Sequence, residues 1–203
     1  MKLGILGGSF NPIHIGHLLI AEEVYNVHNL SKVIFIPVNL PPHKDVNGLV
    51  EPMHRYQMVK EATKGISHFE VSDAEIRRTG KSFTIDTIQF ILNAYGNKCE
   101  IYLIIGADSL NELKTWKNIK MISEICRIVT INRPGYNIDA LDDLENILSK
   151  DGVANIKKLM IHIPPVDISA TEIRNNLKNG YSTKDWTPLA VNEYIKKHRL
   201  YKT

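Results

Sequence analysis

The sequence predicts an α/β protein built on an open, doubly wound and mostly parallel sheet with helices on both faces. Five short runs are almost continuously apolar, and segments with helical features separate them. Strands that lack a polar–apolar alternation are usually covered on both faces, as in parallel sheets. Regular alternation of such strands with helices is typical of doubly wound folds. The expected strands are residues 3–6, 33–38, 101–105, 127–131 and 159–163.

The segments between these strands predict helices. In the first segment, Ile20, Val24 and Val27 recur at helical spacing, and polar residues occupy the other side. Near the C-terminus, Ser169 precedes Glu172 by three residues, and this capping box predicts a helix that begins at the serine. The expected later helices cover residues 52–63, 84–94, 109–123, 141–149, 169–179 and 188–197.

Length and composition are those of one ordinary globular unit. The 203 residues fit a single domain over 1–203, with a small C-terminal helical portion from about residue 169. The formal net charge of +3 permits an anionic ligand but is too small for a nucleic-acid coat. No apolar run is long enough to cross a bilayer, and the stretch before Gly7 is too short for a signal peptide. We therefore expect a cytoplasmic protein without a membrane or nucleic-acid partner.

The two cysteines receive no functional role. Cys99 and Cys126 lie far apart in the sequence, with no CxxC or metal-ligand spacing. We expect them to be buried, reduced thiols, as is usual in the cytoplasm.

The segment after the first strand has the features of a phosphate site. Residues 7–17, GGSFNPIHIGH, connect the first strand to the first helix, and we call them the front loop. Ligands of doubly wound sheets bind beyond the carboxyl ends of strands, where a glycine pair and a helix start offer backbone N–H donors. His14 and His17 can face the same anion, and Gly16 between them leaves room for close approach. The spacing lacks a third zinc ligand and matches neither common nucleotide-binding glycine loop.

A second anion site is expected at the late helix, which we call the rear helix. Ser169 and Thr171 place hydroxyls in its first turn, and Arg174 follows about one turn later. Guanidinium is a permanent planar donor that suits a departing pyrophosphate. Taken alone, these residues also fit a well-capped surface helix with a solvated arginine. The hypothesis of a shared site therefore requires the front loop and the rear helix to meet in space.

Together the two segments resemble the signature motifs of a known superfamily. Residues 8–17 resemble the (H/T)xGH signature of nucleotidyltransferases with a Rossmann-like fold, which join a nucleoside triphosphate to a phosphorylated acceptor and release pyrophosphate. Residues 168–174, ISATEIR, resemble the ISSTxIR motif, with Ala170 in place of the usual second serine. Class I aminoacyl-tRNA synthetases share the first signature, but this chain is too short for their additional parts. The resemblance implies ATP contacts from Gly7, Gly8, Ser9, Phe10, Gly16, Ile168, Ser169 and Thr171, and catalytic roles for His14, His17 and Arg174.

A loop after the second expected strand resembles the acceptor site of bacterial nicotinate-nucleotide adenylyltransferases. Residues 41–44 read PPHK, and their prolines fix a loop that presents a histidine and a lysine. The segment 82–87, SFTIDT, also has a counterpart in that family. In the family, main-chain N–H groups near Thr84 and just after Trp116 hold the nicotinate carboxylate. The resemblance implies acceptor contacts from Asn39, His43, Lys44, Ser82, Thr84 and Trp116.

The residues after the third expected strand have alternative interpretations. Gly106 allows close approach of a ring or sugar, and Asp108 can accept hydrogen bonds from ribose hydroxyls. The same two residues fit a turn before a helix capped by Ser109 and Glu112 equally well. Trp116 fits either the core or a platform for a pyridine ring. The resemblance favours the platform and assigns the glycine and the aspartate to ATP.

The resemblance extends from Gly7 to Arg174 and implies one reaction. ATP and nicotinate mononucleotide would give nicotinate adenine dinucleotide and pyrophosphate, a late step in NAD synthesis. Mg²⁺ is expected to arrive with ATP, without a dedicated carboxylate cage, and a homo-oligomer is left open. Adenylyltransferases for phosphopantetheine, which carry threonine at the position of His14, or for nicotinamide mononucleotide are the nearest alternatives. A non-catalytic nucleotide sensor is the alternative from another class, although both anion sites are intact.

Overall fold

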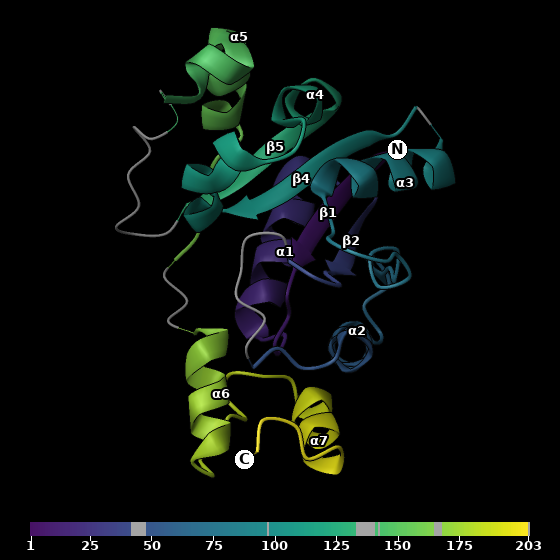
Figure 1. The fold of residues 1–203 in the computed structure, drawn as a ribbon, viewed down its shortest axis with the longest axis vertical. Coiled ribbons are helices and arrows are strands. Elements are labelled where there is room, and N and C mark those ends of the chain that lie inside the picture. The colour runs from purple at the N-terminus through teal and green to yellow at the C-terminus, as the bar shows by residue number, and fades with distance from the viewer. Residues whose placement is uncertain (42–47, 97, 133–140, 142, 165–167, 203) are drawn as a thin grey trace. The chain divides into compact units, whose positions relative to one another are not determined.

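The computed structural model of the chain describes residues 1–41, 48–96, 98–132, 141, 143–164 and 168–202 (Figure 1). The strands are β1 (Lys2–Gly8), β2 (Lys32–Pro37), β3 (Phe69–Val71), β4 (Glu100–Gly106), β5 (Cys126–Asn132) and β6 (Ile161–His162). The helices are α1 (Ile15–His28), α2 (Pro52–Thr63), α3 (Thr84–Tyr95), the 3₁₀ helix η1 (Ala107–Thr115), α4 (Ile119–Ile125), α5 (Glu145–Lys158), α6 (Ala170–Lys178) and α7 (Leu189–Lys197). Within these residues, no helix is both long and apolar enough to span a membrane.

The strands form one sheet in the order β3-β2-β1-β4-β5-β6. The ladders that join β1 to β4, β4 to β5 and β5 to β6 are parallel, and Leu6 lies opposite Ile104 in the first of them. This order is that of a Rossmann-like sheet, and it reverses between β1 and β4. The predicted fold class is therefore confirmed. The sequence pattern missed β3, which has three residues and no fully buried position.

The chain divides into two compact units and passes from one to the other within β1, α1 and β2, and again before α3 and before α6. The front loop, α2, β3, α6 and α7 belong to the second unit, whereas α3, β4, η1, α4, β5 and α5 belong to the first. The first unit comprises Met1–Leu6, Glu23–Val33 and Phe83–Pro165, and the second comprises Gly7–Glu22, Ile34–Ser82 and Val166–Thr203.

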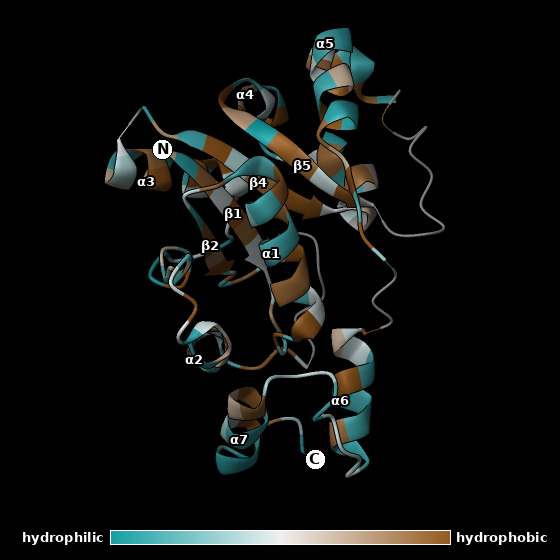
Figure 2. Cartoon of the chain, turned by 180° about the vertical axis from the view of Figure 1, so that it is seen from behind, coloured by the Kyte–Doolittle hydropathy of each residue, from teal (hydrophilic) through white to brown (hydrophobic). Residues whose placement is uncertain are grey.

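Apolar strands form the centre of the first unit. Figure 2 shows hydrophobic residues along β4 and β5, and α4 and α5 pack against β5. Gly4 is needed where β1 passes Leu30, because a Cβ on this glycine would lie 2.8 Å from Leu30 Cδ1. Val24 is fully buried, but Val27 is exposed, so the expected apolar face of α1 ends one turn early.

Two expected helices differ from the structure. The segment 109–123 is divided into η1 and α4, because Trp116 is extended and Asn118 adopts a left-handed φ of 56°. The helix expected at 141–149 extends as α5 to Lys158, which leaves only two residues for β6. Ser149, where the sequence pattern ended, has a non-helical φ of 65° inside α5. Helical periodicity in the sequence does not predict these local breaks.

The two cysteines are predicted to differ in reactivity. Cys126 is buried at the start of β5, and burial raises the pKa of its thiol to about 12. Cys99 is half-buried rather than buried, which corrects the expectation from the sequence. Because the thiolate is the reacting form, a disulfide reagent at pH 8 should modify about one thiol per folded chain quickly. The second should react only after denaturation. A Cys99→Ser variant that still loses a thiol quickly would contradict this assignment.

Candidate nucleotide site

The two histidines of the front loop pack against each other where the loop enters α1. Their ring centroids are 3.8 Å apart, and the backbone N–H of His14 donates to Nδ1 of His17 over 3.2 Å. His14 is buried, whereas His17 is half-buried. Because Nδ1 of His17 accepts this hydrogen bond, the neutral ring carries its proton on Nε2. In this tautomer, Nε2 of His17 is a hydrogen-bond donor.

Phe10 fixes the shape of the front loop from inside the core. Its side chain is 1% exposed, and its ring meets the rings of His17 and Phe35. A Cβ on Gly8 would lie 3.2 Å from the Phe10 ring, while a Cβ on Gly7 would meet no atom within 4 Å. Any ligand contact from these glycines or from Phe10 is consequently made by the main chain.

The rear helix, α6, meets the front loop through Arg174. Nη1 of Arg174 donates to the carbonyl oxygen of Asn11 over 2.9 Å, and Nη2 donates to Oγ1 of Thr171 over 3.1 Å. Ser169 caps the helix as predicted, because its Oγ accepts the N–H of Glu172 at 3.1 Å. The meeting of the two segments that the site hypothesis requires is therefore confirmed. These contacts use two of the five guanidinium N–H donors.

Arg55 is a second arginine at the front loop, and sequence reasoning did not single it out. Its side chain is fully buried in α2 and donates to three carbonyl oxygens: Nε to Val50 at 2.8 Å, Nη1 to Ser9 at 2.8 Å and Nη2 to Asn39 at 3.1 Å. Burial lowers its pKa to about 10, so the group remains charged at neutral pH. Arg55 and Arg174 both donate to uncharged oxygens, and their positive charges favour an anion nearby.

The signal for Arg55 was present in the sequence. Met58, Val59 and Ala62 are buried on the inner face of α2, and Arg55 occupies the same face at i, i+3, i+4 and i+7 spacing. A charged residue on an apolar helical face is seldom buried without several hydrogen-bond partners. Such a position indicates a structural or electrostatic role.

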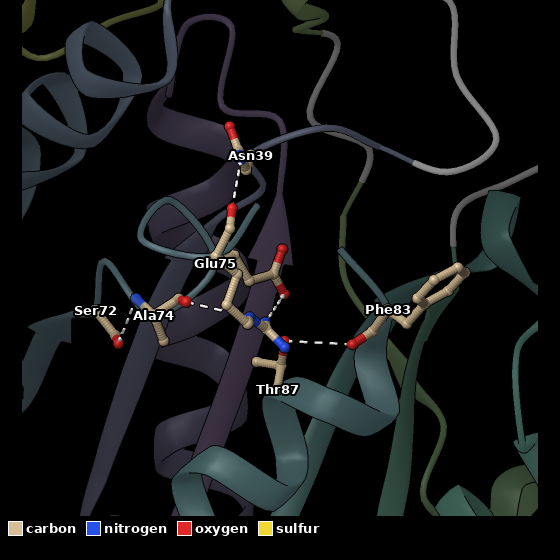
Figure 3. Close-up of polar contacts among 7 residues, drawn as sticks. Asn39, Ser72, Ala74, Glu75, Phe83 and Thr87 are labelled. Carbon is tan, nitrogen blue, oxygen red and sulfur yellow. Dashed lines mark hydrogen bonds and ion pairs between the residues drawn. The ribbon is translucent and has the colours of Figure 1, made fainter. Parts of the chain in front are cut away.

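The acceptor residues of the second unit are partly engaged in structural contacts. The side-chain amide of Asn39 donates to the carbonyl oxygen of Arg78 over 2.8 Å, above the turn that begins at Ser72 (Figure 3). Arg78 Nε in turn donates to the carbonyl oxygen of Ala74 at 3.2 Å. The backbone N–H of Ser82 donates to the carbonyl oxygen of Leu40. The buried Oγ of Ser82 has no hydrogen-bond partner among the described residues. His43 and Lys44 lie outside the residues that the structure describes.

Four further predicted residues belong to the first unit. Gly106 ends β4, and η1 follows at once without a side-chain cap, so the expected capping by Ser109 and Glu112 is wrong. Asp108 lies within η1. Trp116 is half-buried at the end of η1, which excludes a fully buried core position. Thr84 opens α3, whose first turn is closed by a hydrogen bond from Thr87 Oγ1 to the carbonyl oxygen of Phe83 (Figure 3).

A cavity of about 310 Å³ lies elsewhere in the first unit. It is lined by the first residues of β4 and β5 and by parts of α4 and α5, including Glu100, Arg127 and Asn155. None of the predicted site residues lines it, so it is separate from the nucleotide site.

A doubly wound sheet whose first loop carries paired histidines and meets an arginine-bearing helix defines the chain as a nucleotide-binding α/β protein. A family model described as cytidylyltransferase-like matches residues 5–176. A "Probable nicotinate-nucleotide adenylyltransferase" of Thermoanaerobacter sp. (strain X514) is 41% identical over 202 residues, which cover 100% of this chain and 95% of that protein. The protein of the same name from Moorella thermoacetica is 39% identical over 201 residues, with 99% and 92% covered.

The chain therefore belongs to the cytidylyltransferase-like family and, within it, to the group of nicotinate-nucleotide adenylyltransferases. A solved structure of Plasmodium falciparum nicotinic acid mononucleotide adenylyltransferase, complexed with NaAD, has a TM-score of 0.76. It is 20% identical, and the match covers 98% of this chain and 97% of that chain. This likeness supports the fold.

Proposed function

We propose that the protein transfers the adenylyl group of ATP to nicotinate mononucleotide and releases pyrophosphate. The observation that carries the proposal is the hydrogen bond from Arg174 to Asn11, which joins the two segments expected to grip one polyphosphate. Membership of the adenylyltransferase group supports the choice of acceptor. His14 and His17 are assigned to the triphosphate, Arg174 and the start of α6 to the leaving pyrophosphate, and Lys44 to the acceptor phosphate.

The proposed reaction needs no protein base, because the acceptor phosphate is already an anionic nucleophile. One of its oxygens attacks the α-phosphorus of ATP, and the bond from that phosphorus to the bridging oxygen breaks as pyrophosphate leaves. Catalysis then consists of in-line alignment and of neutralising negative charge. The guanidinium of Arg174 neutralises part of this charge, and the Nε2–H of His17 stabilises it by hydrogen bonding.

Mg²⁺ is proposed to reach the site with ATP. Within the described part of the chain, no group of three or more His, Cys, Asp or Glu side chains could hold a metal ion. Mg²⁺ commonly keeps several waters and relies on substrate phosphates, whose charge it neutralises. The donors found around the front loop are N–H groups, which suit phosphate oxygens rather than a cation.

Pyrophosphate release tests the proposal and separates it from the alternatives. We expect release from ATP and Mg²⁺ with nicotinate mononucleotide, and little with ATP alone. Parallel assays with nicotinamide mononucleotide and phosphopantetheine measure acceptor preference, and faster release with either would overturn the proposed acceptor. If the protein bound ATP but released no pyrophosphate with each of the three acceptors, a nucleotide sensor would be favoured instead.

A further inference from the structure

The C-terminal tail reaches the nucleotide site through Tyr201. The hydroxyl of Tyr201 donates to Oδ1 of Asn11 over 2.8 Å, although the two residues are 190 positions apart. The tail folds back after α7, where Arg199 and Tyr201 adopt positive φ values of 53° and 63°. Figure 1 shows the C-terminus between α6 and α7. Non-glycine residues hold such angles only where surrounding contacts fix them, so the tail has a defined conformation.

Asn11 connects four segments of the second unit. Its Oδ1 accepts from the Tyr201 hydroxyl and from the backbone N–H of Val50 at 3.2 Å, and its Nδ2 donates to the carbonyl oxygen of Gly48 at 3.0 Å. Its own carbonyl oxygen accepts from Arg174. The donors and acceptors around the amide allow one orientation of the side chain. A change in that orientation would move the front loop and the contact with Arg174 together.

The hydroxyl of Tyr201 remains a donor across the physiological pH range. Burial raises its pKa above the ordinary value, while the nearby guanidinium groups of Arg174 and Arg55 act in the opposite direction with a smaller effect. The neutral hydroxyl is the form that can donate to Asn11. The phenol thus lies near both arginines of the site.

We propose that Tyr201 is a positioning residue for adenylyl transfer, whose hydroxyl fixes Asn11 and thereby holds the front loop and Arg174 in the geometry that the polyphosphate requires. The inference rests on the proposed function, which assigns these groups to ATP. A second contact between the C-terminal segment and the front-loop region supports it, because Ile15 at the start of α1 donates its N–H to the carbonyl oxygen of Trp186 over 2.9 Å.

Tyr201→Phe removes the hydroxyl and little else. Because the hydroxyl acts on groups that must be aligned in the transition state, we expect kcat to fall about tenfold, with a change in the KM for ATP of less than about threefold. Tyr194→Phe is the matched control. The hydroxyl of Tyr194 bonds Nδ1 of His54 at 2.9 Å, which joins α7 to α2 without touching the front loop. Its kcat should equal that of the wild type.

The pattern of results separates positioning from stability and from the proposed function itself. Thermal unfolding is measured for both variants, and a similar loss of kcat in both would overturn the positioning role. A wild-type kcat for Tyr201→Phe would also overturn it. A wild-type protein that releases no pyrophosphate with any acceptor would refute the proposed function instead.

A double-mutant cycle with Arg174→Lys provides a second readout that does not depend on overall stability. If Tyr201 acts through Arg174, Tyr201→Phe should lower kcat about tenfold in the wild-type background. The same substitution should lower kcat clearly less in the Arg174→Lys background. Equal losses in the two backgrounds would contradict the proposed route through Asn11.

Discussion

His17→Ala is expected to lower kcat by about 100-fold or more while the protein remains folded. The ring is oriented by the His14 N–H, which donates to Nδ1, so the neutral ring carries its own proton on Nε2, the atom assigned to the triphosphate. A donor that strengthens as negative charge builds contributes mainly to the transition state, and removal of one such donor typically costs about 10²–10³-fold in kcat. Steady-state pyrophosphate release at saturating ATP is the measurement.

Two further variants make this test specific. Gln has an amide N–H at about the reach of Nε2, so His17→Gln should recover part of the activity that His17→Ala loses. His68→Ala is the matched control, because His68 pairs with Glu22 of α1 at 2.8 Å and none of the proposed site roles involves it, so its kcat should be unchanged. An unaltered kcat with only a raised KM for His17→Ala would show that the imidazole binds ATP without serving the transition state.

Elements with strong local signals could be predicted from the sequence, whereas those decided by packing could not. α2 follows the expected residues 52–63, because Pro52 favours the first helical turn and the apolar period is regular. α6 begins after Ser169 because the cap is local. The end of η1 at an extended Trp116 and the break in α5 at Ser149 depend on backbone angles for which the helical period of the sequence carries no signal.

In the candidate site too, contiguous motifs could be predicted from the sequence and long-range contacts could not. The front loop and α6 could be recognised because each is a contiguous motif, and Arg174 joins them as expected. Tyr201 could not be found this way, since its partner Asn11 lies 190 residues away and only the fold brings them together. Arg55 is intermediate, because helical periodicity places it on a buried face but does not reveal its three carbonyl partners.

Arg55→Met is expected to reduce the free energy of unfolding by about 2–4 kcal/mol. The methionine fills much of the same space but leaves the carbonyl oxygens of Val50, Ser9 and Asn39 without their shared donor. These oxygens belong to the front loop and to both ends of the segment that contains the expected acceptor loop. Urea denaturation of the wild type and the variant measures the change.

Arg77→Met is the matched control, since this side chain is 78% exposed and pairs with Asp73 four residues earlier. An exposed pair of this kind contributes about 0–1 kcal/mol, so its removal should change stability little. The loss of unfolding free energy for Arg55→Lys should lie between those of Arg55→Met and Arg77→Met. An ammonium keeps the charge but cannot reproduce the planar guanidinium that reaches three separate carbonyls. If Arg55→Met were as stable as Arg77→Met, the buried guanidinium would not be the group that holds these segments.

The positive charge of Arg55 leads to a second prediction, which concerns ATP binding and does not follow from the hydrogen bonds alone. Burial lowers its pKa to about 10 against smaller opposite effects that include the Glu51 carboxylate, and its three hydrogen-bond acceptors are uncharged oxygens, so a bound polyphosphate would add negative charge that stabilises the cation. ATP should therefore stabilise the wild type against thermal unfolding more than it stabilises Arg55→Met, since at a given concentration a ligand that binds the folded state more tightly stabilises it more. Arg55→Lys, which retains the charge, should keep more of the ATP-induced shift than Arg55→Met does. Equal shifts in all three proteins would assign Arg55 to loop structure alone.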